Sequence, residues 1–485
     1  MLKHFRNYAS AGLIGSLIGL VTFPLLTRNL SVDAYGWLGL VSVTVTVFIG
    51  IGKLGMQTAM LRFFGEARAQ GERQLADLMG TMAGATLLLA GASLVLWLLY
   101  TAFVVPLLPD GQTAVPLFYV AAALVPIKVV FSIASSVLKA DQRSGVLGTL
   151  TIIEKALKLS FIVLIVTALG VSSEKVMAST VVVELITLLL VLYLGRQYLR
   201  DAQPHLSRSK MKPLIAFGLP AMTAELITVL LETGDRYVVQ AYLGSVELGH
   251  YSAAVNICLY LEFVLILSLQ SAIVPHYVKL FEERGREATL AFLNTTLRYY
   301  FAVALGIFAV FSATAPVLLI LLAGERYEPG VVVIIWFAAG FVALGSVSIA
   351  AAGIYIDKRT RALVRWGAVA FVVNITLNVL LVPVFGLIAA GISTFVALSI
   401  QCLGVYREGY RTLPVAPPLA TVGVCLIAAL AALLAATSVQ QGYGLGDLFA
   451  VGTVSTLTYV VVLLTLSGQL RSDFIGYLRG RLGAA

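Results

Sequence analysis

Long apolar runs separated by short polar segments dominate the chain. A membrane-spanning helix needs about 20 consecutive apolar residues, and by this criterion the sequence predicts about fourteen spans. The connecting segments are at most about two dozen residues long, so no soluble domain is expected. The spans are predicted at 9–27, 35–57, 78–102, 116–137, 146–169, 175–195, 213–242, 248–271, 298–322, 330–355, 363–382, 386–405, 419–437 and 448–467.

Composition agrees with this pattern. Of the 485 residues, 59% are hydrophobic and only 12% are charged, whereas soluble domains are about 45–50% apolar and about 25% charged. A soluble multidomain protein is therefore excluded. The net charge of +9 would suggest nucleic acid as the partner of a soluble protein, but basic loops of a membrane protein explain it here. We expect an all-α, multi-pass membrane protein that binds no nucleic acid.

Basic residues indicate how the spans are oriented. Lys and Arg accumulate in cytoplasmic loops of membrane proteins. With the N-terminus inside, 25 of the 33 Lys and Arg fall on the cytoplasmic side, five fall within spans, and only Arg28, Lys175 and Arg326 fall on the other side. Both termini are therefore predicted to be cytoplasmic.

Short motifs recur at a constant spacing. Ser31-Val32-Asp33 and Ser245-Val246-Glu247 are 214 residues apart, as are Gly71-Glu72-Arg73 and Gly285-Arg286-Glu287. Asp141-Gln142-Arg143-Ser144 and Asp357-Lys358-Arg359-Thr360 are 216 apart. These matches predict two parallel six-helix repeats, a transporter architecture in which the substrate site lies at the interface of the repeats. The predicted parts are a first lobe at 1–200, a basic linker at 201–212, a second lobe at 213–406, and two extra helices with a tail at 407–485.

Sequence motifs of enzymes are absent. The four histidines show no HExxH spacing, and there is no Walker A motif, GxSxG motif or Cys/His cluster. We therefore expect neither catalysis nor a cofactor. Coupling of transport to H⁺ or Na⁺ stays open.

Ionisable residues within the predicted spans are the candidate site. Such residues are costly in the bilayer and persist when they are paired or face a wet cavity. Bases suit an anionic group such as a diphosphate, and acids suit a coupling cation. The first lobe carries a net +2 in its spans and the second a net −3, so we predict a basic half and an acidic half. The predicted substrate-binding residues are Lys53, Lys128, Lys155 and Arg236, and the predicted ion-coupling or gating residues are Glu184, Glu225, Glu232, Asp235 and Glu262.

Simpler interpretations of these charges stay open. Glu154 and Lys158, like Glu232 and Arg236, have the i,i+4 spacing of an ion pair within one helix. Lys53 lies near a span end, from which its side chain can extend to the membrane surface. The single acids Glu184 and Glu262 could serve as polar contacts between helices.

Three segments carry a family resemblance. The segment FGLPAMTAELITVLLETGDRYVVQAYLGSVELGHYSAAV, with Pro220, Asp235 and Arg236, resembles the polysaccharide-transport family, which includes the Wzx-type O-antigen flippases. PLLTRNLSVDAYGWLGLVS near the N-terminus and FGLIAAGIST at Phe385–Thr394 are similar to the same family. That family belongs to the multidrug/oligosaccharidyl-lipid/polysaccharide exporter superfamily, in which lipid II flippases and drug exporters share the fold.

The resemblance implies a function. It implies two six-helix lobes around a central cavity, with two extra helices, and alternating access. It also implies transfer of undecaprenyl-diphosphate-linked oligosaccharide across the bacterial cytoplasmic (inner) membrane for synthesis of O-antigen, capsule or exopolysaccharide. The implied partners are the lipid-linked substrate, membrane lipid, and the polymerase and other assembly proteins, and we expect a monomer. Two alternatives remain open: a cation-coupled multidrug antiporter of the same fold, and an enzyme or scaffold component of an envelope-glycan pathway.

Overall fold

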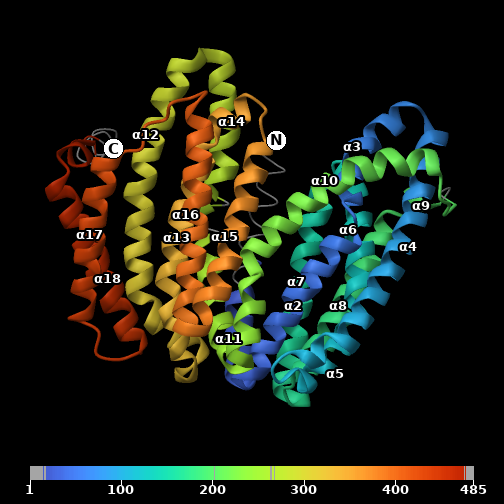
Figure 1. Cartoon of the computed structure of the whole chain (residues 1–485), viewed down its shortest axis with the longest axis horizontal. Helices are drawn as coiled ribbons and strands as arrows, with labels where there is room; N and C mark the ends of the chain where they lie inside the picture. The colour runs from blue at the N-terminus through green and yellow to red at the C-terminus, as the bar shows by residue number, and fades with distance from the viewer. Residues whose placement is uncertain are drawn as a thin grey trace, which may run out of the picture. The chain divides into compact units, whose positions relative to one another are not determined.

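Helices are the only regular elements in the described part of the chain (Figure 1). The computed structural model describes residues 18–200, 203–262, 265–266 and 268–473, together with Gly15 and Gly476. The chain divides into two compact units, one up to Gly249 and one from His250. The all-α, multi-pass prediction is confirmed.

The first unit is a succession of helical segments that ends in a long helix. Its final helix, α11 (Asp235–Glu262), begins in this unit and is kinked at Gly244, where φ is 84°. The preceding elements are α2 (Val32–Gly52), α3 (Met56–Ala69), α4 (Glu72–Phe103), η1 (Val105–Leu107), α5 (Gly111–Ala121), α6 (Leu124–Ala140), α7 (Ser144–Leu164), η2 (Ile165–Leu169), α8 (Ser173–Leu194), α9 (Arg196–Leu199) and α10 (Arg208–Thr233).

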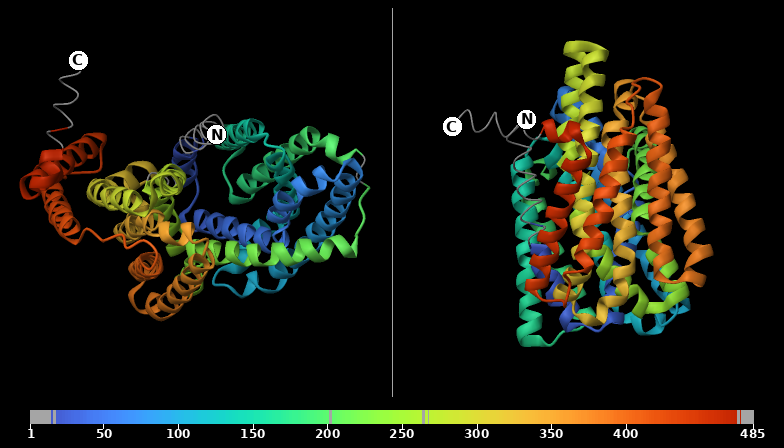
Figure 2. Two further views of the ribbon diagram at one scale, coloured as in Figure 1. Left: turned by 90° about the horizontal axis from the view of Figure 1, so that it is seen from above. Right: turned by 90° about the vertical axis from the view of Figure 1, so that its left-hand side faces the viewer.

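The second unit is built around one long kinked helix, α12 (Ser268–Ala323). Helices α17 (Leu419–Thr437) and α18 (Leu445–Leu466) pack on α12 and on each other, as Figure 2 shows. The remaining elements are η4 (Glu325–Gly330), α13 (Val331–Ala350), α14 (Ala352–Ile356), α15 (Arg361–Phe385) and α16 (Leu387–Tyr410).

The exact number of spans is not confirmed as fourteen. Within the described residues, ten helical stretches are long and apolar enough to cross a membrane, or eleven if the bent pair α5 and α6 forms one span. Helices α10 and α11 count as a single stretch, Arg208–Glu262. Helix α7 is absent from the ten because Glu154, Lys155 and Lys158 crowd charge into it. The predicted first span, 9–27, lies partly outside the described residues, of which 18–29 are helical.

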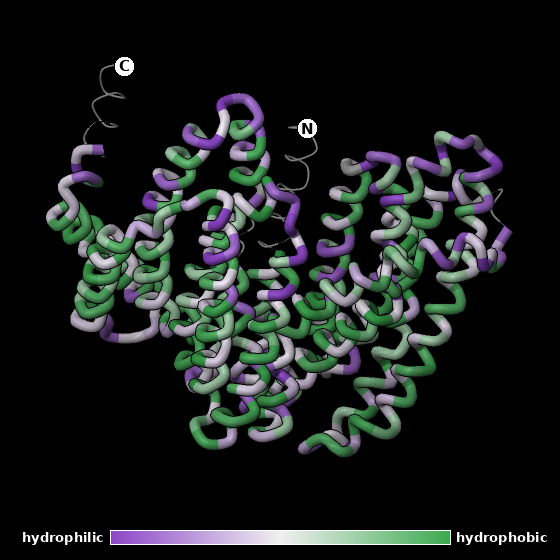
Figure 3. Tube along the Cα trace, turned by 45° about the horizontal axis from the view of Figure 1, so that its top comes forward, coloured by the Kyte–Doolittle hydropathy of each residue, from purple (hydrophilic) through white to green (hydrophobic). Residues whose placement is uncertain are grey.

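Hydropathy follows the helices. Figure 3 shows hydrophobic stretches along the helices and hydrophilic positions at helix ends and turns. Large apolar side chains are widely exposed, including Leu87, Leu99 and Phe103 on α4 and Leu430 and Leu434 on α17. Such a surface is stable against lipid and not against water.

The internal repeat is also visible in the backbone φ angles. Residues with positive φ are uncommon, yet four pairs of them recur at the spacing found in the sequence. Gly71 (φ 109°) and Gly285 (φ 76°) are 214 residues apart, and Gln142 (φ 59°) and Lys358 (φ 57°) are 216 apart. The other two pairs are Asp110 with Gly324, and Gly170 with Gly386.

The turns at Gln142 and Lys358 share their side-chain interactions as well. Arg143 Nε donates to Asp141 Oδ2 at 2.7 Å, and Arg359 Nε donates to Asp357 Oδ2 at 3.2 Å. The two halves of the chain therefore repeat the same local structure at this point, which supports two parallel repeats.

Candidate functional site

A break between α2 and α3 places the first predicted lysine. Lys53 ends α2, and Leu54 (φ 49°) and Gly55 (φ 69°) take left-handed conformations before α3 begins at Met56. The break lies directly on the α10 backbone: a Cβ on Gly55 would be 2.0 Å from the carbonyl oxygen of Gly218. Only glycine allows this approach, so the break and α10 are locked in one register.

This register brings Lys53 to Glu225 of α10. Lys53 Nζ lies 2.5 Å from Glu225 Oε1, and Gln57 Nε2 donates to Glu225 Oε2 at 3.0 Å. Lys53 is only 8% exposed, so its side chain is held inside the unit, and both carboxylate oxygens of Glu225 are engaged. The extension of Lys53 to the membrane surface stays a prediction.

Four charged residues from three helices form a second cluster, called here the charge quartet: Lys128 of α6, Glu154 and Lys158 of α7, and Glu184 of α8. Lys158 Nζ lies 2.8 Å from Glu154 Oε1 and 2.6 Å from Glu184 Oε1. Lys128 Nζ lies 2.5 Å from Glu184 Oε2 and 3.7 Å from Glu154 Oε1. The Lys128–Glu184 contact is an ion pair without hydrogen-bond alignment. The Glu154–Lys158 pair expected from its spacing is thus confirmed, within a larger cluster.

The quartet is electrically balanced and partly accessible. The Glu184 side chain is fully buried, whereas those of Lys128 and Lys158 are 26% and 29% exposed. Because an isolated buried charge is very costly, the two lysines and two glutamates stabilise one another. An anionic group that reached the lysines would have to compete with Glu184 and Glu154 for them.

Lys155 and Arg236 differ from the paired bases. Lys155, on α7, is half-buried, and the described residues place no carboxylate within ion-pair distance of it. Its Nζ lies 2.4 Å from the position that a Cβ on Gly15 would occupy. Arg236 is 8% exposed, and its Nε has no hydrogen-bond partner within the described chain. Glu232 has an interaction partner, and its predicted ion pair with Arg236 stays a prediction.

The remaining predicted acids lie in different surroundings. Asp235 is 1% exposed at the start of α11, and both Asp235 and the exposed Glu232 have interaction partners. Glu262 belongs to the second unit, at the end of α11, and is half-buried. No ion pair or hydrogen bond is found for Glu262 within the residues that the structure describes.

The predicted separation into a basic and an acidic half does not describe the first compact unit. This unit includes α10 and the start of α11, which bring Glu225, Glu232 and Asp235 into the same unit as the lysines. Five bases and five acids from the predicted spans therefore share it. Charges that look segregated along the chain are paired in space, as Lys53 and Glu225 demonstrate.

Three members of these clusters were not predicted as site residues: Gln57, Glu154 and Lys158. Gln57 lies in the first turn of α3, across the break from Lys53, so no helical spacing in the sequence relates the two residues. Lys158 was assigned only to its pair with Glu154, because the sequence contains no sign that Glu184 of α8 lies against it. Among the described residues, no group of three or more His, Cys, Asp or Glu side chains could hold a metal ion.

Comparison with known proteins places this arrangement in a family. A family model described as "Polysaccharide biosynthesis protein" matches residues 1–281, more than half of the chain. No curated protein sequence matches the chain.

Solved structures match the fold over nearly its whole length. A lipid II flippase, MurJ, in an inward closed conformation has a TM-score of 0.77 at 15% identity, covering 96% of this chain and 99% of that one. An inward-facing multidrug resistance MATE family transporter of the MOP superfamily has a TM-score of 0.63 at 14% identity, covering 82% and 94%. A MOP superfamily transporter from Pyrococcus furiosus has a TM-score of 0.54 at 15% identity, covering 85% and 95%.

At 14–15% sequence identity the structural matches establish the fold alone. The family model, which matches residues 1–281, establishes the family. The buried lysines and their carboxylate partners thus lie in a multi-pass membrane protein with the fold of MOP superfamily transporters. The chain belongs to the polysaccharide biosynthesis protein family.

Proposed function

We propose that the chain is a flippase that moves undecaprenyl-diphosphate-linked oligosaccharide across the bacterial cytoplasmic membrane by alternating access. The observation that carries this proposal is the set of four lysines inside the helices of the first unit: Lys53, Lys128, Lys155 and Lys158. A diphosphate is a compact anion that ammonium groups bind strongly in a poorly hydrated site. Membership of a polysaccharide biosynthesis family supports a glycan-bearing substrate.

The pairing of the lysines suggests how binding would be reversible. In the absence of substrate, Glu225, Glu184 and Glu154 compensate three of them. Because Lys155 has no carboxylate partner in the described chain, it is the first lysine available to bind the diphosphate. The phosphate oxygens then compete with Glu184 and Glu154 for Lys128 and Lys158. Release restores the carboxylate pairs, so the site does not retain its cargo.

A cation-coupled antiporter of the same fold is the second candidate. Glu262 favours it, because a half-buried carboxylate without an ion pair in the described chain is a suitable binding group for H⁺ or Na⁺. Coupling to H⁺ or Na⁺ is also compatible with the flippase.

Lipid analysis of a deletion strain distinguishes these functions. Loss of the protein is expected to trap an undecaprenyl-diphosphate glycan in the cytoplasmic leaflet and to abolish surface polysaccharide. New drug sensitivity without such accumulation would contradict the flippase and support the antiporter. Formation of a glycan bond by the pure protein would instead support an enzyme.

Reconstitution then tests the lysines. In proteoliposomes with a fluorescent lipid-linked oligosaccharide, Lys155→Gln is expected to lower the transfer rate roughly tenfold, the loss of one charge-assisted hydrogen bond. Lys175→Gln is the matched control, because Lys175 is exposed and donates to backbone carbonyls of Leu169 and Gly170. Equal rates for the two variants would exclude Lys155 from substrate handling.

A further inference from the structure

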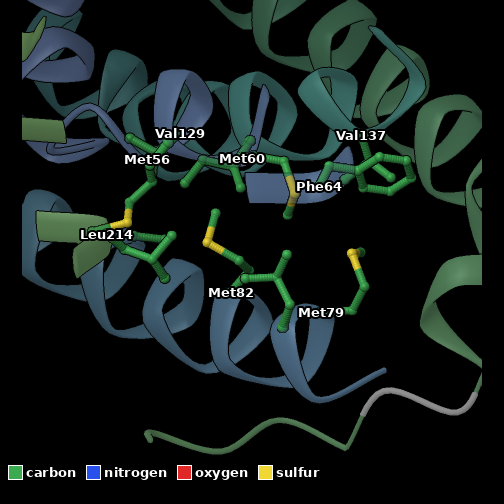
Figure 4. Packing of buried hydrophobic residues seen from close by; sticks show 12 residues of the cluster. Met56, Met60, Phe64, Met79, Met82, Val129, Val137 and Leu214 are labelled. Carbon is green, nitrogen blue, oxygen red and sulfur yellow. The ribbon is translucent and has the colours of Figure 1, made fainter. Parts of the chain in front are cut away.

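The first unit contains an apolar cavity whose lining residues include none of the lysines described above. Its volume is about 230 Å³, and it lies between α3, α4, α6 and α8. Met60, Met79 and Met82 line it together with Val130, Ile133 and Val137. Figure 4 shows these methionines converging with Met56 in one buried cluster.

Methionine makes this cavity adaptable. Four of the chain's eight methionines belong to this cluster: Met56, Met60, Met79 and Met82. Methionine is unbranched and polarisable, and it is used where a binding surface must fit flexible apolar ligands. An apolar cavity of this size excludes water and accepts a hydrocarbon group. An alkyl chain is the matching ligand.

A second cavity adjoins the first and is polar. Its volume is about 550 Å³, and Arg68, Glu72, Arg73 and Gln197 line it. Met79 and Tyr198 line both cavities, so the two spaces meet at these residues. The combination of an apolar end and a polar end matches an amphiphile.

Charge at the polar end favours an anion. Arg68 Nη1 lies 2.6 Å from Asp141 Oδ1, and Arg143 Nε lies 2.7 Å from Asp141 Oδ2. Arg73 has no carboxylate partner in the described part of the chain. With Arg68 and Arg73 against Glu72, the lining of this cavity carries a net charge of +1, which suits a monoanionic phosphodiester.

The apolar cavity is accessible from the membrane. Leu87 lines it and is 62% exposed, on the same helix as the exposed Leu88. A bilayer lipid can therefore insert a chain at this point while its headgroup stays at the first turn of α4, which contains Arg73.

We propose that these two cavities form a binding site for one anionic glycerophospholipid. An acyl chain occupies the methionine-lined cavity, and the phosphate lies between Arg73 and Arg68. The glycerol hydroxyls of a phosphatidylglycerol headgroup can donate to Glu72 and Gln197. This site is separate from the lysines of the proposed flippase function and does not depend on that function.

Native mass spectrometry of the delipidated full chain tests the proposal. Titration with phosphatidylglycerol is expected to fill one site at least about tenfold more tightly than phosphatidylcholine, and inorganic phosphate is not expected to displace the lipid. Equal binding of the two lipids would overturn the proposal. Displacement by free phosphate would do so as well, as would binding of a polyprenyl phosphate in place of phosphatidylglycerol.

Two variants address the two ends separately. Arg73→Gln removes the unpaired cation and is expected to weaken phosphatidylglycerol binding roughly tenfold. Ala134→Phe fills the apolar cavity, whose lining includes Ala134, and is expected to abolish binding of the acyl chain. Arg62→Gln is the control, because Arg62 pairs with Glu66 on α3 and lines neither cavity. If Ala134→Phe does not fold, unchanged binding by Arg73→Gln alone overturns the proposal.

Discussion

Gln142 and Lys358 are 216 residues apart and adopt the same left-handed backbone conformation, with φ of 59° and 57°. Each follows an aspartate that accepts a hydrogen bond from the next arginine. A non-glycine residue in this conformation costs roughly 1–2 kcal/mol. Both repeats therefore keep the same strained turn.

Valine at either turn position is expected to destabilise the protein by a similar amount. A β-branched side chain clashes with the backbone when φ is positive, so Gln142→Val and Lys358→Val should each cost roughly 1–2 kcal/mol. Thermal unfolding in detergent measures the effect. Lys139→Val, in the last turn of α6, is the control; a cost as large as that of Gln142→Val would exclude the turn as the cause.

Crowding at the α2–α3 break predicts a glycine requirement. Gly218→Ala places a Cβ 2.6 Å from the carbonyl oxygen of Leu54, whereas a Cβ on Gly65 of α3 meets nothing within 4 Å. Gly218→Ala should lower stability by at least about 1–3 kcal/mol through overpacking. Gly65→Ala should be neutral or stabilising by up to about 1 kcal/mol, as measured by unfolding in detergent. Equal stability of the two variants would contradict the close approach.

The Lys53–Glu225 pair predicts strong coupling between two distant positions. Among the described residues, Lys53→Gln leaves Glu225 with Gln57 as its one remaining partner, and Glu225→Gln leaves the buried Lys53 without a carboxylate. Each single variant should be destabilised, and the double variant should recover about 1–3 kcal/mol of the summed loss. A double-mutant cycle of unfolding free energies gives this value, and strict additivity would show that the pair does not form.

Glu184 is expected to be the most sensitive acid of the charge quartet. It pairs with both Lys128 and Lys158 and is fully buried. Glu184→Gln should therefore cost about 3–5 kcal/mol, the usual penalty for breaking a buried ion pair. Glu154→Gln is the matched comparison, because Glu154 is more exposed and its contact with Lys128 is longer. A larger effect at position 154 would contradict the arrangement.

Asp141 predicts an acid-sensitive component of stability. Burial by itself would raise the pKa of Asp141, but hydrogen bonds from Tyr198, Arg68 and Arg143 outweigh burial and lower that pKa. A lowered pKa contributes stability that is complete above the unfolded value of about 3.9 and is lost as the pH falls through the lower folded value. Asp141→Asn should therefore lower the melting temperature at pH 7 and flatten its dependence on pH below about 4.

The control for this experiment is Asp33→Asn, at the exposed start of α2. It should leave both the melting temperature and its pH dependence close to those of the unmodified protein. The same pH dependence in Asp141→Asn as in the unmodified protein would mean that other groups cause the acid sensitivity.

Much of the fold follows from local patterns. Apolar runs predict where helices cross the membrane, because each helix satisfies its own backbone hydrogen bonds. The motif pair at Gly71 and Gly285 marks real turns of the same kind. The number of spans is less predictable, since α7 carries three charges and α10 continues into α11 with hardly a break.

The residues of the candidate site could be predicted from the sequence, but their partners could not. Composition and patterning by themselves determined that this is a multi-pass helical membrane protein with an internal repeat, because periodicity is a property of neighbouring residues. They also identified the ionisable residues that the membrane makes costly. Only the tertiary structure decided their partners: Lys53 meets Glu225 across 172 positions, and Lys128 meets Glu184 from another helix. Helix packing brings such residues together, and their partners cannot be deduced from the spacing of residues along the chain.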